Sequence, residues 1–416
     1  MTDFYDDLES RDAETRETEI VTALPGLIEN AVTKAPGWAA HLDGIDPAAI
    51  NSLKALASLP VLRKSALSES QAANPPFGGF APGATGSYGR LLMSPGPIFE
   101  PEGRGDDCWR TARAFFAAGF RKGDIIQNCY SYHLSPGAFI MEAGARSLQC
   151  AVIPAGVGNT EMQIEAIARY KPTGYSGTPD YLKVLLDAAH EAGKDASSIT
   201  RALVSGGALF PSLRDEYKAR GIAVLQCYAT AELGLIAYES DALEGQVLAG
   251  MIVAEGAIVE IVKPGTGDPV ANGEVGEVVV TTFNPDYPMI RLATGDLSAI
   301  MEGASPCGRT NMRINGWMGR ADQAAKMKGL FIRPEQVAKI AKRHGELGRI
   351  RLEISRNEAQ DVMTLKAECE EQGEEFSEQI AETLQSVTKM NGEVEIVPPG
   401  TLPNDGLIIA DLRDYE

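Results

Sequence analysis

The spacing of apolar residues changes along the chain and divides it into segments with different predicted structures. Over residues 1–75, apolar positions such as Leu24, Leu27 and Ile28 recur every three or four residues, which is the period of one helix face. We expect this stretch to be a helical lead-in. From residue 105 to about 230, helical segments alternate with short apolar strands. This alternation is typical of an α/β domain with a largely parallel sheet.

The predicted elements of the α/β part are short. The expected strands are Ile125–Cys129, Ala151–Pro154, Gly174–Ser176, Ala202–Ser205 and Ala223–Gln226. The expected helices are Trp109–Ala118, which ends at Gly119, and two that begin at Pro179 and Pro211. A cap residue followed by proline, as in Thr178-Pro179, favours a helix start because the first helical residue needs no N–H donor.

Residues 246–318 have a β-rich pattern instead. Two apolar runs, Val247–Val262 and Glu274–Thr282, flank the turn-forming segment KPGTGDPVANG. The remaining residues read strand, helix, strand, strand, helix, strand, over Leu330–Ile332, Pro334–Arg343, Ile350–Ser355, Val362–Glu368, Phe376–Lys389 and Glu393–Val397. This βαββαβ order predicts a small α+β domain over 323–416, a large domain over 1–320 and a hinge near 320–323.

Composition supports two domains and excludes several classes of partner. The chain has 416 residues, more than one core usually serves, and a net charge of −19. Such an acidic surface repels nucleic acids and anionic lipids. The six cysteines form no CxxC pair, which argues against a zinc site or a disulfide framework. The first thirty residues are unlike a signal peptide, and no apolar run approaches the roughly 20 residues of a membrane span. We therefore expect a cytoplasmic protein.

The segment FAPGATGSYGRLL contains a glycine-rich loop, Gly83–Ser87, that has the composition of a phosphate-binding loop. Successive backbone N–H groups in such a turn can bind an anion without a charged side chain. The loop matches neither the GxxxxGK[ST] nor the GxGxxG pattern. It is also consistent with a plain surface turn.

Two further stretches carry acids in places where a nucleotide could bind. In CYATAELG, Tyr228 and Glu232 follow a predicted strand, where open α/β sheets bind ligands. Glu232 is either a ligand for Mg²⁺ beside phosphate oxygens or a solvated acid at a helix start. In MIRLATGDLSA, Asp296 either accepts two ribose hydroxyls or belongs to an ordinary turn.

The fourth stretch, NGWMGRADQAAKMKGLFIRPEQV, lies at the predicted domain boundary. Arg320 and Asp322 are placed there either to form a hinge or to form an interdomain ion pair. Gly329 precedes a predicted strand.

Taken together in this order and spacing, the four stretches resemble the adenylate-forming enzymes, and within them the phenylacetate–CoA ligase branch. The resemblance covers nearly the whole chain. It extends to LPVLRKSAL and PPFGGFAP before the loop, to VIPAGVGNTEMQIEAI and GYSGTPDYL in the α/β part, and to PPGTLPNDG near the end.

The resemblance implies an acyl-CoA ligase that uses ATP, releases AMP and depends on Mg²⁺ and coenzyme A. A small-molecule carboxylate, expected to be aromatic, reacts with ATP to form an acyl-adenylate, and the thiol of CoA then displaces AMP. The implied architecture is a large N-terminal α/β domain with a β-rich part plus a small, mobile C-terminal α+β domain. The implied assembly is a homodimer.

The same resemblance implies roles for individual residues. The nucleotide would be held by Gly83, Ala84, Thr85, Gly86 and Ser87 at its phosphates, by Tyr228 and Thr230 alongside it, and by Asp296 at the ribose with Arg320 beside it. Glu232 would bind Mg²⁺, Asp322 would be the hinge, and Gly329 would flank the channel for the CoA thiol. The residues implied at the acyl pocket are Tyr130, Tyr132, His133 and Gly207, although aromatic residues in such a strand are as often core.

The chain departs from the family pattern at two lysine positions. The loop lysine is replaced by Ser87, and the lysine that follows a glycine on the small domain is replaced by Leu407, after Gly406. Removing one preorganised donor to developing charge costs roughly 10²–10³ in rate. We hypothesise that Lys326 or Lys328 compensates by reaching the phosphate or CoA.

Three functions therefore remain open from the sequence. The first is a complete carboxylate–CoA ligase. The second is a degenerate relative that binds nucleotide, acyl-CoA or a partner protein without turnover. The third is an enzyme that performs only the thioester-forming step.

Overall fold

The computed structural model describes residues 4–207, 209–241, 247–321, 323–328, 330–357, 360–370, 373–403 and 407–413. These residues form two compact units, Met1–Gly319 and Arg320–Glu416, which are described separately below. In the described part of the chain, no helix combines the length and the apolar character needed to cross a membrane.

The first unit begins with the expected helices. They are α1 (Ala13–Lys34), α2 (Pro36–His41), α3 (Leu53–Ala57) and α4 (Lys64–Ala73). The Asp12 side chain accepts the N–H of Thr15 (2.8 Å) and caps α1. On α1, Leu24 and Ile28 are fully buried, so the apolar face predicted from the spacing packs into the core.

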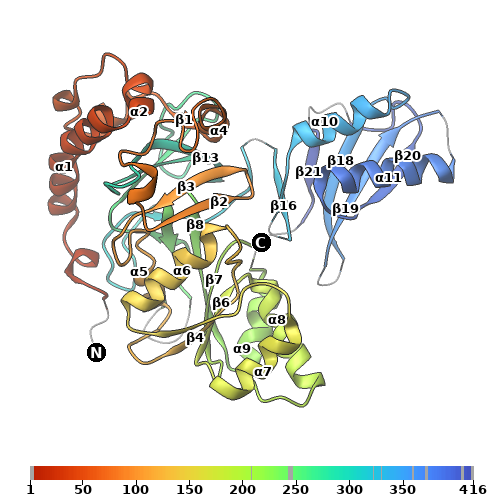
Figure 1. Ribbon diagram of the computed structural model, residues 1–416, viewed down its shortest axis with the longest axis horizontal. Helices are drawn as coiled ribbons and strands as arrows, with labels where there is room; N and C mark the ends of the chain where they lie inside the picture. The colour runs from red at the N-terminus through yellow and green to blue at the C-terminus, as the bar shows by residue number, and fades with distance from the viewer. Residues whose placement is uncertain are drawn as a thin grey trace. The chain divides into compact units, whose positions relative to one another are not determined.

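A nine-stranded sheet forms the centre of this unit (Figure 1). Its strand order is β14-β15-β10-β9-β8-β7-β6-β4-β5. The strands are β4 (Ile125–Asn128), β5 (Ala151–Pro154), β6 (Gly174–Gly177), β7 (Arg201–Val204), β8 (Ala223–Thr230), β9 (Gly234–Tyr238), β10 (Met251–Val253), β14 (Ile300–Met301) and β15 (Arg313–Ile314). The run β5-β4-β6-β7-β8 is parallel, and the remaining pairs are antiparallel.

Helices cover both faces of the parallel strands. They are α5 (Ala112–Ala117), α6 (Pro136–Ser147), α7 (Thr160–Tyr170), α8 (Pro179–Glu191) and α9 (Pro211–Ala219). Helices α7, α8 and α9 share one apolar core with the sheet, and α5 and α6 share another. Figure 1 shows the two groups on opposite sides of the strands. Adjacent residues of β7 enter different cores, Ala202 one and Leu203 the other, as the alternation of side chains along a strand requires. The α/β prediction is confirmed.

A second sheet and a hairpin complete the first unit. The four-stranded sheet has the order β1-β13-β12-β11. Its strands are β1 (Leu62–Arg63), β11 (Ala257–Val262), β12 (Gly276–Thr282) and β13 (Met289–Ser298). The hairpin of β2 (Arg90–Ser94) and β3 (Ile98–Glu102) directly follows the glycine-rich loop. The β-rich segment Val247–Val262 contains two strands, because Gly256 turns the chain at φ +81° and places β10 and β11 in different sheets.

Other element boundaries also differ from the prediction. Helix α5 begins three residues after the expected start, Trp109, because Arg110 adopts a positive φ of 66° that interrupts the helix there. Strand β8 continues four residues beyond Gln226 and pairs with β9. That pairing makes the segment before Gly234 the turn of a β-hairpin, which excludes the alternative of a helix start there.

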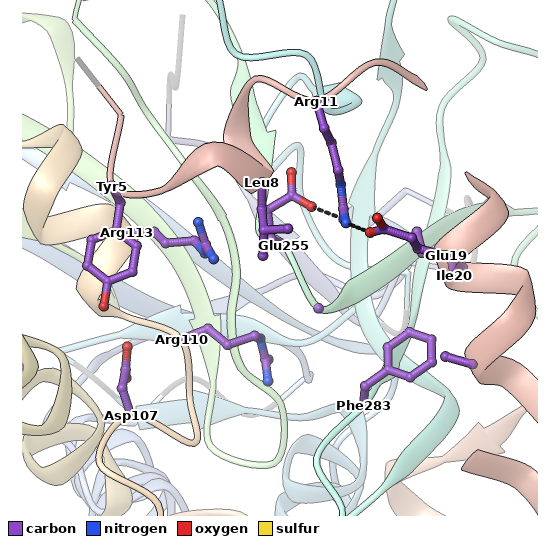
Figure 2. A pocket seen from close by; sticks show the side chains of 12 residues that line it. Tyr5, Leu8, Arg11, Glu19, Ile20, Asp107, Arg110, Arg113, Glu255 and Phe283 are labelled. Carbon is purple, nitrogen blue, oxygen red and sulfur yellow. Dashed lines mark hydrogen bonds and ion pairs between the residues drawn. The ribbon is translucent and has the colours of Figure 1, made fainter. Parts of the chain in front are cut away.

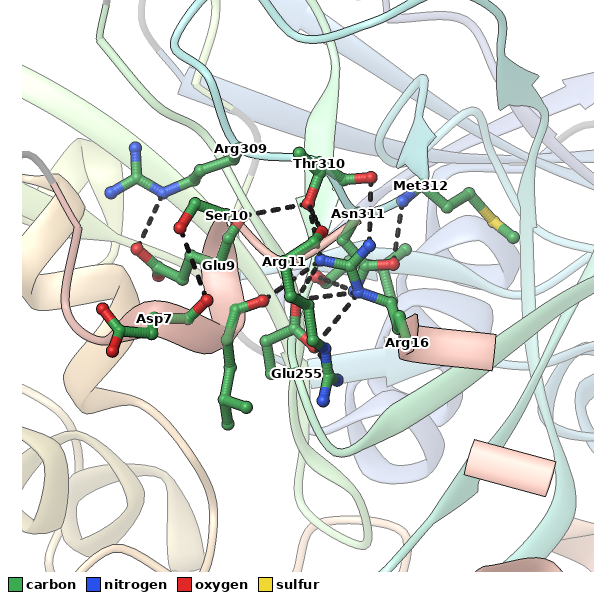
Figure 3. A network of polar contacts seen from close by, with 12 residues as sticks. Asp7, Glu9, Ser10, Arg11, Arg16, Glu255, Arg309, Thr310, Asn311 and Met312 are labelled. Carbon is green, nitrogen blue, oxygen red and sulfur yellow. Dashed lines mark hydrogen bonds and ion pairs between the residues drawn. The ribbon is translucent and has the colours of Figure 1, made fainter. Parts of the chain in front are cut away.

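The N-terminal segment is attached to the first unit by buried ion pairs. Figure 3 shows Arg16 meeting both Glu255 and Thr310. The Glu9 carboxylate is 1% exposed and accepts hydrogen bonds from Tyr238 Oη (2.7 Å) and from the Tyr5 N–H (3.0 Å). It also forms an ion pair with Arg309 Nε at 3.2 Å. Because a buried carboxylate is costly without such partners, this network holds the segment in place.

The second unit is an α+β fold around one sheet of order β20-β19-β18-β21. Its elements are β16 (Ala325–Met327), β17 (Leu330–Ile332), α10 (Pro334–Arg343), β18 (Ile350–Asn357), β19 (Gln360–Glu368), α11 (Glu374–Thr388), β20 (Glu393–Val397) and β21 (Ile409–Asp411). Both helices pack on the sheet through one apolar core. The first expected strand, Leu330–Ile332, lies outside this sheet and pairs with β16 instead. Strand β21, which was not predicted, supplies the fourth position.

Candidate functional site

The glycine-rich loop presents free backbone donors. Residues Thr85–Ser87 form a 3₁₀ turn, and both the N–H and the hydroxyl of Ser87 donate to the Ala84 carbonyl (2.8 and 2.7 Å). The N–H groups of Ala84, Thr85 and Gly86 have no acceptor among the described residues, and these residues are exposed. Such a set of donors fits the oxygens of a phosphate.

Two residues outside the loop hold its shape. The Tyr88 hydroxyl accepts the Gly83 N–H at 2.7 Å, and a Cβ on Gly83 would come within 2.9 Å of the same hydroxyl oxygen. The Arg104 guanidinium donates to the carbonyls of Ser87 (2.8 Å) and Tyr88 (3.2 Å). The Arg104 guanidinium therefore contacts the loop in which Ser87 replaces the family lysine. No sequence signal identified Arg104, which is 17 residues from Ser87 in the chain.

Glu232 is buried and paired with a lysine. Lys64, the first residue of α4, places its ammonium 2.9 Å from one Glu232 oxygen and 3.0 Å from the other. The Glu232 side chain is 3% exposed. Burial opposes its charged form, but the Lys64 charge and hydrogen bond outweigh this and hold the pKa of Glu232 below its ordinary value. The interpretation of Glu232 as a solvated acid at a helix start is wrong, because a buried hairpin turn carries it.

Backbone geometry fixes the turn that presents Glu232. Gly234 has φ +69°, and a Cβ at this position would lie 2.7 Å from Cβ of Trp109. Both the left-handed backbone and the close contact require glycine. Lys64 belongs to the LPVLRKSAL segment, but sequence reasoning did not single it out.

Asp296 is an acceptor for two aromatic side chains. Tyr228 Oη donates to one carboxylate oxygen at 2.7 Å, and Trp317 Nε1 donates to the other at 3.1 Å. The residue is 7% exposed and lies inside strand β13. The alternative that Thr294-Gly295-Asp296 is an ordinary turn is therefore wrong. The structure brings together Tyr228 and Asp296, two of the residues implied at the nucleotide.

Thr230 provides a test of whether a ligand fits here. It lies two residues after Tyr228 on β8, and alternate residues of a strand share a face. Its Oγ1 is buried and has no hydrogen-bond partner within 3.5 Å among the described residues, although it lies close enough to Glu232 to help lower the pKa of that carboxylate. A buried polar atom of this kind is costly unless something completes its hydrogen bonding. A nucleotide or a hydrated cation beside Glu232 would do so.

The described residues contain no group of three or more His, Cys, Asp or Glu side chains that could hold a metal ion alone. A divalent cation at Glu232 would accordingly need oxygen ligands from substrate or water. This is how Mg²⁺ usually binds, with one or two carboxylates and phosphate oxygens. The residues present therefore fit a magnesium–nucleotide complex.

The residues implied at the acyl pocket do not all lie together. The Tyr130 hydroxyl bonds to the carbonyls of Gly177 (2.8 Å) and Ser205 (3.1 Å), at the carboxyl ends of β6 and β7. Gly207 lies two residues after Ser205, and a Cβ there would be 3.3 Å from Pro179 Cδ. Tyr130 and Gly207 thus share the strand ends where open α/β sheets bind ligands.

Tyr132 and His133 are placed differently. The Tyr132 hydroxyl donates to Glu142 on α6 (2.8 Å) and accepts from Asn128 Nδ2 (2.7 Å). His133 is exposed. The Tyr132 hydroxyl is therefore hydrogen-bonded to helix α6.

In the second unit, two predicted cations meet at one aromatic ring. The Arg320 guanidinium lies 5.1 Å and the Lys326 ammonium 5.2 Å from the centre of the Phe331 ring, within the range of cation–π attraction. Lys328 is exposed and has φ +48°. Leu407, at the missing lysine position, is 43% exposed. The predicted hinge Asp322 and the predicted CoA-channel residue Gly329 lie outside the described residues.

A separate cavity of about 450 Å³ lies beside the N-terminal segment. Its charged lining consists of Arg11, Arg110, Arg113, Glu19, Asp107 and Glu255. Figure 2 shows Arg11 between the two glutamates, with an ion pair to Glu255 at 2.7 Å. Its positive and negative residues are equal in number, and none of the predicted site residues lines it. The charge balance gives it no preference for a phosphate group.

Comparison with known proteins shows which family the chain belongs to. Residues 108–284 match the profile of the AMP-binding enzyme family. The phenylacetate-coenzyme A ligase of Pseudomonas putida is 31% identical over 79% of this chain and 76% of its own length. The chain belongs to the phenylacetate–CoA ligase family. The ligase of this name from Thermus thermophilus is 26% identical over 91% of this chain and 92% of its own length.

Solved structures show the same architecture for this phenylacetate–CoA ligase family member. A 2-hydroxyisobutyryl-CoA ligase in complex with its acyl-AMP and CoA aligns with a TM-score of 0.85 and 26% identity, over 100% of this chain and 93% of the other. An o-succinylbenzoate CoA synthetase from Bacillus subtilis, at 15% identity and a TM-score of 0.58, shares the fold. The adenylate-forming architecture inferred from the motifs is confirmed.

Proposed function

We propose that this chain is an ATP-dependent carboxylate–CoA ligase that forms AMP and acts on an aromatic acid. The observation that carries the proposal is the buried Lys64–Glu232 pair at 2.9 Å. In this pair the Glu232 carboxylate stays ionised, and Lys64 adds a positive charge at the place implied for the metal and the phosphates. Because Arg104 contacts the glycine-rich loop, Lys64 and Arg104 place two positive charges near the proposed phosphate and metal site, although both family lysine positions are changed.

In the first half-reaction, a substrate carboxylate oxygen attacks the α-phosphorus of ATP and pyrophosphate leaves. The free N–H groups of Ala84, Thr85 and Gly86 would bind phosphate oxygens, and Asp296 would accept the ribose hydroxyls in place of its aromatic donors. Magnesium, bound by Glu232, would supply positive charge to the phosphates. Charge developing on the leaving group would be stabilised by these fixed donors, which need no reorganisation.

In the second half-reaction, the thiol sulfur of CoA attacks the acyl carbon and AMP leaves with the bonding electrons. The thiol proton passes to a base or to water. Arg320 and Lys326 on the second unit remain the candidates for contacts with AMP or CoA. Gly329 and Asp322 keep the roles of channel and hinge residue proposed from the sequence.

An aromatic acid is the proposed substrate because four relatives matched across 71–91% of this chain are named phenylacetate–CoA ligases. Tyr130 and Gly207 at the strand ends are the residues proposed to face it. A homodimer and a cytoplasmic location complete the proposal. The six cysteines are all unpaired thiols, which suits a reducing compartment.

The test is carboxylate-dependent exchange of pyrophosphate into ATP across a panel of aromatic and short aliphatic acids, including phenylacetate and 2-hydroxyisobutyrate. Exchange with an aromatic acid, followed by loss of the CoA thiol, supports the proposal. Exchange only with short aliphatic acids overturns the substrate assignment. Absence of exchange with every acid, while AMP or CoA still binds, favours the degenerate relative. Thioester formation from a synthetic acyl-adenylate alone favours the partial enzyme.

A further inference from the structure

Glu100, on strand β3, is a buried acid that the proposed mechanism does not use. It is 2% exposed, and neither carboxylate oxygen has a hydrogen-bond partner within 3.5 Å among the described residues, although Ser94 lies close enough to favour its charged form. The Tyr287 hydroxyl, also 2% exposed, is likewise without a partner there. Burying one polar group in this way costs free energy, and three such oxygens in one region indicate a ligand that the chain alone does not supply.

Helix α4 ties Glu100 to the Lys64–Glu232 pair. Gln71 lies two turns after Lys64 on this helix and holds both polar backbone atoms of Phe99, the N–H and the carbonyl, at 2.8 Å each. The residue next to Phe99 is Glu100. One face of α4 therefore positions a lysine against Glu232 and, seven residues later, the strand that carries Glu100.

The two carboxylates influence each other electrostatically. Burial raises the pKa of Glu100 well above its ordinary value, and the charge of Glu232 raises it further. The pKa of Tyr287 is raised by burial and then by the charges of both acids. The two acids and the hydroxyl thus occupy one electrostatic neighbourhood, which also contains the Lys64 ammonium.

We propose that Glu100 is a second carboxylate of a divalent-cation site, acting together with Glu232, with Tyr287 completing the hydrogen bonding of these acids. The identity of the cation as the magnesium that accompanies ATP rests on the proposed function. Oxygen ligands from two carboxylates are what Mg²⁺ and Mn²⁺ bind best.

The charge count explains why a second acid is needed. Lys64 and Glu232 together are neutral, so a dication arriving at Glu232 meets no net negative charge and is repelled by the ammonium. When a dication displaces the proton of Glu100, the carboxylate adds one negative charge to this group. In addition, a bound metal ion would be a partner for the Glu100 carboxylate oxygens, which have none among the described residues of the metal-free chain.

The test measures metal binding directly on the full-length chain, with Mn²⁺ alone as the probe and the free Mn²⁺ signal in electron paramagnetic resonance as the readout. The variant is Glu100→Gln, which keeps the shape of the side chain and removes its charge. Glu232→Gln is the positive control. The matched control is Glu102→Gln, on the same strand and 6% exposed, whose partner Arg90 lies at 2.6 Å. Circular dichroism verifies that each variant is folded.

The expected result is a dissociation constant raised about tenfold or more in Glu100→Gln and Glu232→Gln, with Glu102→Gln unchanged. Equal affinity in the wild-type chain and Glu100→Gln overturns the proposal, as does the absence of Mn²⁺ binding by the wild-type chain at millimolar concentration. Pyrophosphate exchange is scored separately. Wild-type chain that binds Mn²⁺ through Glu100 but exchanges no pyrophosphate contradicts the ligase function and leaves the metal site standing.

Discussion

Replacing Lys64 by methionine tests the central contact of the site. At 2.9 Å and an effective dielectric constant of about 20, the Lys64–Glu232 attraction is about 6 kcal/mol before the cost of desolvating both groups. Methionine retains the packing of the lysine stem and leaves the Glu232 side chain, 3% exposed, without its cation. Removing one partner of a buried pair costs about 3–5 kcal/mol. We expect the free energy of unfolding of the first unit to fall by that amount.

The measurement is urea unfolding followed by tryptophan fluorescence. The three tryptophans, Trp38, Trp109 and Trp317, all belong to the first unit, so the signal reports on that unit. The double variant with Glu232→Gln is the control, because it removes the stranded charge and should regain most of the loss. A loss below about 1 kcal/mol in Lys64→Met, typical of a solvent-screened pair, would refute the reasoning.

The pH dependence of the same experiment has a definite sign. Because the folded pKa of Glu232 is lowered, its stabilising contribution is present above the pKa of an unfolded glutamate, about 4.3, and is lost as the pH falls through the folded value. The difference between the wild-type chain and Lys64→Met should therefore shrink as the solution is acidified below about pH 4. A difference that grows on acidification would contradict the assignment of Lys64 as the partner that keeps Glu232 ionised.

Three further predictions concern other parts of the first unit. The folded pKa of Glu100 is raised, so its contribution to stability is complete below about pH 4.3 and is lost as the pH rises toward the folded value. In metal-free buffer, Glu100→Gln should therefore be as stable as the wild-type chain in acid and increasingly more stable than it as the pH rises. A stability difference in urea unfolding that stays constant across pH would contradict this. Arg104→Gln should raise the KM for ATP about tenfold with a smaller change in kcat, since the Ser87 and Tyr88 carbonyls lose their donor. Arg104→Lys should show a smaller rise in KM. Equal KM values for the variants and the wild-type chain in pyrophosphate exchange would rule out a role of Arg104 at the loop. Glu9→Gln should lower the free energy of unfolding by about 3 kcal/mol, because the buried Arg309 guanidinium loses its charged partner at 3.2 Å; an unchanged urea midpoint would show that the N-terminal segment is held by other contacts.

Local sequence signals were sufficient for many elements because those signals act over short distances. Strand Ala151–Pro154 has the bounds predicted from its apolar run, and helix α8 begins at Pro179 after Thr178 as expected. Positive φ at Gly256 and Arg110 changed other boundaries. Such conformations depend on what packs around the turn, so the apolar pattern did not indicate them.

Tyr228, Glu232 and Asp296 were predicted at the candidate site from the sequence, whereas Lys64 and Arg104 were not singled out. Tyr228, Glu232 and Asp296 belong to short motifs whose order indicates a nucleotide, and they were named from the sequence. Lys64 lies 168 residues from Glu232 in the chain, and Arg104 is remote from any recognised motif. Their roles arise from helix α4 and from the hairpin that follows the loop, which bring distant segments into contact.

The sequence of this protein was enough to predict its fold class and its family and to propose residues at the nucleotide, since each of these depends on local patterns in a particular order. The sequence also showed that two lysines are missing. The tertiary structure was needed to show that Glu232 is buried rather than solvated, that Lys64 neutralises it, and that Glu100 lies unpartnered in the same neighbourhood. Burial and charge pairing are properties of groups that meet through the fold, and their energies depend on surroundings that no local pattern specifies.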